Sequence, residues 1–229
     1  MILLGVPWLL TSCGNGNAVT PSDPTTKLLI INTSPDAGPA ACFINNLWLG
    51  GESLSPSQRL YFRFSATPSY RSINTGQLTI ALRTEHSVAL GLPVVDSIVT
   101  NRSYSMFLMG LRSKDSLITK ILIDTAANPA QGRGKIRFVN ASPRTPALDL
   151  TANGTTAFSK ITYTNSTKYT ELPAGVYSFK LMPTGASATI LTSLSSVTIL
   201  DGKLYTIYCK GLAGVTDTSA ISLNIITNK

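Results

Sequence analysis

Apolar and polar residues alternate along several short segments of the chain. In segment 177–181, Tyr, Phe and Leu alternate with Ser and Lys, and the same period of two recurs in segments 78–82, 205–210 and 221–225. Successive side chains of a β-strand point to opposite faces, so each segment predicts a strand with one buried face and one face in water. No segment keeps a helical period, and the chain is therefore predicted to be all-β.

Turn-forming residues separate these predicted strands. Asn153-Gly154 and Asp201-Gly202 favour tight turns because these residue types tolerate left-handed backbone angles, and Pro-Ala-Gly at 173–175 adds another break. Short strands joined by such turns are typical of a sandwich of two antiparallel sheets of the immunoglobulin type.

The chain contains an internal repeat. Segments 27–35 and 135–143 share Lys, Asn, Ser and Pro at the same positions, 108 residues apart. Two later matches keep the same order, segments 76–82 with 175–181 and 104–111 with 205–212. A period of this length predicts two tandem domains rather than the units of a solenoid.

The repeat and the Pro- and Gly-rich stretches divide the chain. We expect a lipoprotein signal peptide at 1–12, a flexible tether at 13–26, a first β-sandwich at 27–125, a linker at 126–132 and a second β-sandwich at 133–229.

The N-terminus resembles a bacterial lipoprotein signal. Residues 1–10 are nearly all apolar, too few to span a bilayer but enough for the apolar core of an export signal. They run into Leu10-Thr11-Ser12-Cys13, which resembles the lipobox. The resemblance implies acylation of Cys13 and a membrane anchor, and Gly14 in place of Asp implies the outer membrane, on its periplasmic or surface face. The alternative is an apolar strand with a buried cysteine, which the lack of Lys or Arg before the run favours.

The second copy carries three motifs of a known family: Val-Asn-Ala-Ser-Pro at 139–143, Leu-Pro-Ala-Gly at 172–175 and Gly-Lys-Leu-Tyr at 202–205. In these it resembles domain-of-unknown-function family 4397, a bacterial envelope family with an immunoglobulin-like sandwich. The first copy keeps Asn32 and Ser34-Pro35 but lacks the Leu-Pro-Ala turn. The resemblance implies an exported, often lipid-anchored protein, and it supplies no catalytic residues.

Charge narrows the range of partners. The chain carries a formal net charge of +8, yet only 13% of its residues are charged. Its cations are scattered, and the densest group is Arg133, Lys135 and Arg137. This favours a solvated basic surface over a nucleic-acid site, and no nucleic-acid partner is predicted. A weak attraction to anionic envelope lipids or polysaccharides fits the charge.

Residues for catalysis or metal binding are scarce. His86 is the single histidine, and the chain has no Gly-x-Ser-x-Gly elbow, no Cys-x-x-Cys pair and no calcium loop. No catalytic residue, metal or cofactor is therefore predicted. A carbohydrate-active hydrolase with an unrecognised carboxylate site is the alternative.

A cluster of aromatic and basic residues is the candidate ligand face. Trp48, Tyr61 and Tyr70, with Arg63 among them, offer rings and a cation that suit a glycan. The alternative is ordinary core and edge packing of these rings.

Two features concern covalent chemistry. Cys42 and Cys209 align with Leu150 and Leu108 of the sister copies, which predicts buried free thiols; a disulfide between them is the alternative. Ser97, Ser116 and Thr125 each follow Asp and precede an apolar residue. That pattern resembles an O-glycosylation signal of exported bacterial proteins, against chance as the alternative.

Together these observations predict a non-catalytic lipoprotein of the cell envelope. Its expected role is binding, adhesion or envelope assembly, with glycans or other envelope proteins as partners and the membrane reached through Cys13.

Overall fold

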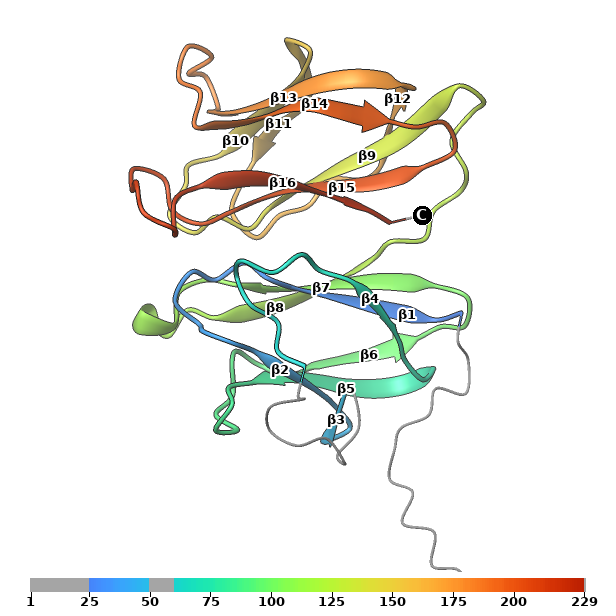
Figure 1. Cartoon of the computed structure of the whole chain (residues 1–229), viewed down its shortest axis with the longest axis vertical. Helices are drawn as coiled ribbons and strands as arrows, with labels where there is room; N and C mark the ends of the chain where they lie inside the picture. Colours follow the sequence, from blue (N-terminus) through green and yellow to red (C-terminus); the bar gives the residue numbers. More distant parts are fainter. Residues whose placement is uncertain (1–24, 50–59, 229) are drawn as a thin grey trace, which may run out of the picture.

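The computed structural model describes residues 25–49 and 60–228 (Figure 1). This part of the chain contains β-strands and one short 3-10 turn, with no α-helix. The all-β prediction is confirmed. The predicted signal peptide, Cys13 and most of the predicted tether lie outside the described residues.

The first domain consists of two four-stranded sheets, ordered β4-β1-β7-β8 and β3-β2-β5-β6. Its elements are β1 (Lys27–Asn32), β2 (Ala41–Ile44), β3 (Leu47–Trp48), β4 (Tyr70–Ser72), β5 (Gly76–Arg83), β6 (Val94–Ile98), β7 (Ser103–Met109), η2 (Arg112–Lys114) and β8 (Ile118–Ile123).

The second domain repeats this topology strand for strand, with sheets ordered β12-β9-β15-β16 and β11-β10-β13-β14. Its strands are β9 (Arg133–Asn140), β10 (Leu148–Ala152), β11 (Thr155–Ile161), β12 (Thr170–Pro173), β13 (Gly175–Pro183), β14 (Thr192–Ile199), β15 (Leu204–Lys210) and β16 (Ser222–Thr227). The internal repeat is therefore a duplicated sandwich.

The sequence predicted antiparallel sheets, and the structure differs from this in one strand pairing of each domain. β1 pairs with β7 in parallel, and β9 pairs with β15 in parallel, so one sheet of each domain is mixed. A tyrosine closes each sandwich: Tyr104 Oη accepts a hydrogen bond from Val99 N (2.9 Å), and Tyr205 Oη accepts one from Leu200 N (3.1 Å). Such a tyrosine corner is characteristic of immunoglobulin-like domains.

The repeated Asn-x-Ser-Pro motif shapes the turn after the first strand of each domain. Asn140 Nδ2 donates to Ile161 O (3.0 Å), while its Oδ1 accepts from Ser142 N (3.2 Å). Asn32 makes the same pair of contacts, with Phe62 O and Ser34 N. The motif is thus explained by structure, because it satisfies buried backbone groups.

Each sandwich has its own apolar core, with one cysteine in each. Cys42 and Cys209 are free and fully buried, in different cores. Burial raises the pKa of the Cys209 thiol to about 12. Both act as small apolar residues, as their alignment with leucines predicted.

The two domains pack face to face through their mixed sheets, so that four sheets stack in layers (Figure 1). A third apolar cluster fills this junction: Leu29, Ile31, Phe107, Met109, Val139, Ala141, Tyr208 and Ile226. The prediction that each strand has one face in water is therefore wrong for β15. All of its residues are buried, because the face that carries Thr206, Tyr208 and Lys210 is turned towards the other domain.

Candidate functional site at the domain junction

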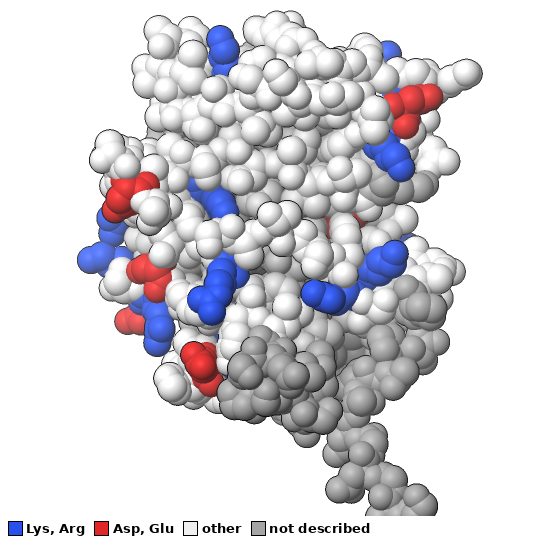
Figure 2. Space-filling model, in the orientation of Figure 1, with Lys and Arg blue, Asp and Glu red and all other residues white. Residues whose placement is uncertain are grey.

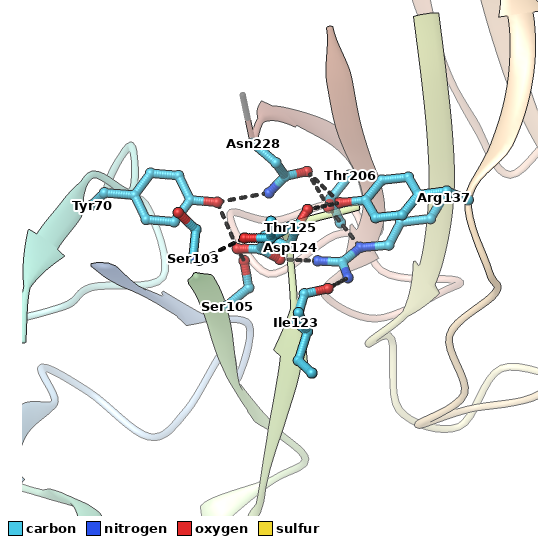
Figure 3. A network of polar contacts seen from close by, with 10 residues as sticks. Tyr70, Ser103, Ser105, Ile123, Asp124, Thr125, Arg137, Thr206 and Asn228 are labelled. Carbon is cyan, nitrogen blue, oxygen red and sulfur yellow. Dashed lines mark hydrogen bonds and ion pairs between the residues drawn. The ribbon is translucent and has the colours of Figure 1, made fainter. Parts of the chain in front are cut away.

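A buried ion pair lies at the junction of the two domains (Figure 3). Arg137 on β9 and Asp124, just after β8, have side chains 5% and 0% exposed, and an Arg137 amino group bonds directly to Asp124 Oδ1. Arg137 also donates to Ile123 O (2.8 Å) and Thr206 Oγ1 (2.8 Å). A charge pair taken out of water is tolerated only when such additional hydrogen bonds complete it.

The carboxylate of Asp124 is satisfied from the first domain as well. Its Oδ2 accepts from Tyr70 Oη (2.5 Å) and Ser105 Oγ (2.7 Å), and Asn228 Nδ2 of the second domain donates to Tyr70 Oη (2.9 Å). Burial, and then the charge of Asp124, raise the pKa of Tyr70. The network is closed on itself and presents no free nucleophile or base.

The network has an approximate twofold symmetry that follows from the duplication. The strand registers make Tyr70 equivalent to Tyr169, Asp124 to Asn228, Ser105 to Thr206 and Leu29 to Arg137. Both sets of residues face each other across the junction, as in a dimer that uses one surface twice. The network is therefore a means of joining the domains.

A groove opens at the rim of this junction, with a volume of about 600 Å³. The first domain contributes Arg63, Phe64 and Ser65, and the second contributes Lys210, Ser222 and Asn224. None of the described residues that line it is acidic. Figure 2 shows basic side chains across the middle of the molecule, on both sides of the junction.

The structure brings Trp48, Tyr61 and Arg63 of the predicted ligand face near one another but directs Tyr70 elsewhere. Trp48 is only 9% exposed, and the centroid of its ring lies 5.1 Å from that of Phe43 and 5.7 Å from that of Tyr61. Tyr61 and Arg63 line a smaller cavity of about 190 Å³, and the exposed Arg63 also lines the junction groove. Tyr70 points into the buried network instead. The four do not form one surface.

The predicted glycosylation residues are all exposed. Ser97 lies on β6 and Ser116 follows η2, whereas Thr125 lies next to the buried ion pair and its Oγ1 accepts from Ser103 N (2.8 Å). The aspartate before Thr125 is 1% exposed, so an enzyme that reads the folded chain has no access to that carboxylate. Ser97 and Ser116 keep the better access.

Metal binding and glycoside hydrolysis both need particular side chains gathered at one place. No group of three or more His, Cys, Asp or Glu comes together in this part of the chain. A glycosidase needs two facing carboxyl groups. Asp149 lines another cavity of about 380 Å³ and is the one acidic residue in its described lining, and the described linings of the two cavities above contain none. No helix in the described part is long and apolar enough to cross a membrane.

Sequence reasoning missed the residues of the junction, among them Lys210 and Asp124. One signal was available: Leu28 to Ile31 is an unbroken apolar run, and such a run is typical of a strand buried on both faces.

The comparisons with known proteins agree with this architecture. The model of the family described as "Domain of unknown function (DUF4397)" matches residues 26–151 and 135–229, so the chain belongs to that family, with two tandem copies. A crystal structure from Bacteroides eggerthii DSM 20697, provisionally described as a cell adhesion protein, aligns with 92% of this chain and 97% of its own, at 10% identity and a TM-score of 0.22. A TM-score this low supports no conclusion about the fold or the function of this chain. No curated protein matches the chain.

Proposed function

We propose that the protein is a non-catalytic binding module of the bacterial cell envelope, anchored at the outer membrane through a lipid on Cys13. The main support is the junction itself. Two sandwiches are joined through an apolar cluster and a buried ion pair, and the rim of the junction carries a groove of ligand size. A junction of this kind holds residues of both domains in fixed positions, as a binding site requires.

The family and the N-terminal sequence support the location. The family match covers both domains, and the resemblance of Leu10-Thr11-Ser12-Cys13 to a lipobox supports acylation at Cys13. Several acyl chains on one cysteine hold a protein stably at a membrane. The tether then places the two-domain unit away from the bilayer.

Lipid labelling and protease treatment test this proposal. In the native host, the wild-type chain is expected to take up a radiolabelled fatty acid and to sediment with outer membranes, whereas the Cys13→Ser variant does neither. Protease added to intact cells, with permeabilised cells as the control, then separates surface binding from a role in periplasmic assembly. An unlabelled wild-type chain in the cytosolic fraction would refute the proposal.

A further inference from the structure

The junction groove combines two cations with polar side chains. Arg63 is exposed, and Lys210 is 9% exposed at the end of β15. Among the described residues neither cation forms an ion pair. Ser65, Ser222 and Asn224 add hydroxyl and amide groups to the same lining. Such groups bond readily to the hydroxyls of a sugar.

Lys210 is a buried cation that has no acidic partner among the described residues. Its Nζ donates to Phe64 O of the other domain and lies 4.4 Å from the centroid of the Phe64 ring. Burial lowers the pKa of Lys210. A carbonyl and a ring face offset only part of the free energy of taking an ammonium group out of water, and an anion close to the ammonium group offsets more of it.

The sister domain shows that packing alone does not require this lysine. The equivalent residue at the end of β7 is Met109, which is fully buried in the same junction. On the opposite rim, Lys120 on β8 also bonds across the junction and donates to Thr164 O (2.7 Å), although the registers make Lys120 equivalent to Asn224 and not to Lys210. Each rim therefore has one lysine that joins the domains, and the Lys210 rim adds Arg63 and an open groove.

Two acidic residues lie next to residues that line the groove: Asp36 follows Pro35, and Asp217 precedes Thr218. Asp36 accepts hydrogen bonds from Arg112 N (2.7 Å) and Ser113 N (3.0 Å), and Asp217 accepts one from Ser219 N (2.8 Å). Neither lines the groove. Within the described part of the chain, an anion in the groove thus finds two cations and no competing carboxylate in the lining.

We propose that this groove binds an acidic saccharide, with its carboxylate or sulfate held between Arg63 and Lys210 and its hydroxyls bonded to Ser65, Ser222 and Asn224. The volume of about 600 Å³ lies within the range of about 300–1,000 Å³ that is usual for small-molecule sites. This inference rests on the proposed function and names the ligand class for it.

Binding of defined probes to the purified full chain tests the inference. Calorimetric titration uses a galacturonate oligosaccharide, a heparin oligosaccharide, neutral maltodextrin and polyglutamate. At least one of the two acidic saccharides is expected to bind, with an affinity that falls as salt rises, and maltodextrin is not. Arg63→Gln and Lys210→Met are each expected to raise Kd about tenfold, as loss of one charge-assisted contact does. Arg63 is exposed, so its variant does not put the fold at risk.

Two matched controls separate a site from general charge. Arg102→Gln removes an exposed cation just before β7, at the other end of the strands from the groove, and Lys120→Met removes the cross-domain contact of the opposite rim. Both are expected to leave Kd unchanged. If Arg102→Gln weakened saccharide binding as much as Arg63→Gln, the binding would depend on the net charge of +8 and not on the groove. Polyglutamate binding as tight as that of the saccharides, or no binding of either acidic saccharide, would overturn the inference while leaving lipidation and location unaffected.

Discussion

Within the buried polar network, charge breaks the symmetry of the junction at Arg137 and Asp124. Their counterparts in the other domain are Leu29 and Asn228, which are uncharged. The pair is fully enclosed, so each charge depends on the other and on the hydrogen bonds around it. Removing one member leaves the other as an uncompensated buried charge.

The variant Asp124→Asn is therefore expected to destabilise the protein by about 3–5 kcal/mol, the usual loss when one partner of a buried ion pair is removed. Urea unfolding followed by circular dichroism measures the loss. The double variant Asp124→Asn with Arg137→Leu carries at both positions the residue of the sister domain and is expected to recover most of the stability. A single variant as stable as the wild type would contradict this account of the pair.

Three buried groups that can lose a proton, one thiol and two phenols, predict how the stability of the protein depends on pH. Burial raises the pKa of Cys209 to about 12 from 9.0, and those of Tyr169 and Tyr208 to about 12 from 10.0. The unfolded chain loses these protons near pH 9–10 while the folded chain keeps them, so unfolding releases protons in this range.

The free energy of unfolding is thus expected to be fully retained below about pH 9 and to fall as pH rises from there towards 12. Urea midpoints at pH 8 and at pH 10.5 measure the difference. Cys209→Leu, which carries the residue of the sister strand, removes one titrating group and should flatten the curve. Equal midpoints at both pH values in the wild type would show that these groups ionise alike in the two states.

At the scale of the element, the glycine that ends the seventh strand of each domain fixes the following loop. Gly211 has a φ of +85°, and a Cβ there would lie 2.4 Å from Ala220 O, in the loop before β16. Gly110 after β7 repeats this, with Ser116 O at 2.1 Å. Left-handed backbone and close backbone contact both require glycine at these positions.

Gly211→Ala and Gly202→Ala separate the two requirements. Gly202 has a similar φ of +72° but open space around its α-carbon, so its variant is expected to lose only about 1 kcal/mol of stability from backbone strain. Gly211→Ala adds a backbone clash, and a further loss of roughly 2 kcal/mol or more is expected. Thermal unfolding of the two variants measures the difference. A loss of the same size in both would mean that the loop before β16 yields to the added methyl group.

Strands and turns were largely predictable because both are local properties of the chain. The period of two in segment 177–181 and the turn at Asn153-Gly154 specify β13 and the loop before β11 without knowledge of the rest. The parallel pairing of β1 with β7 was not predictable from the sequence, because it depends on how strands that are far apart in the chain meet. The candidate groove was predictable only at Arg63, because Lys210 lies more than a hundred residues away and its role depends on the other domain.

At the scale of the whole molecule, the surface that joins the two domains cannot be identified from the alternation of apolar and polar residues. In β15 the period of two separates Tyr205, Ile207 and Cys209 from Thr206, Tyr208 and Lys210, and the more polar second set predicts a face in water. Burial of the second set by another domain is a property of the assembled chain. Because the junction buries an apolar cluster and a hydrogen-bonded ion pair, the two domains are expected to unfold together rather than move independently.

Phe107 tests this coupling most directly. It is 0% exposed and meets Tyr208 of the other domain edge to face, with ring centroids 5.7 Å apart. The wild-type chain is expected to give a single calorimetric transition whose van't Hoff and calorimetric enthalpies agree. Phe107→Asp places a carboxylate in the junction but not in the core of either sandwich, so it should split unfolding into two transitions, one for each domain. Val176→Asp, which adds the same charge at a site 63% exposed, is the control and should keep one transition. Two transitions already in the wild type would mean that the junction joins the domains too weakly to couple them, and a groove shared between them would then lack fixed walls.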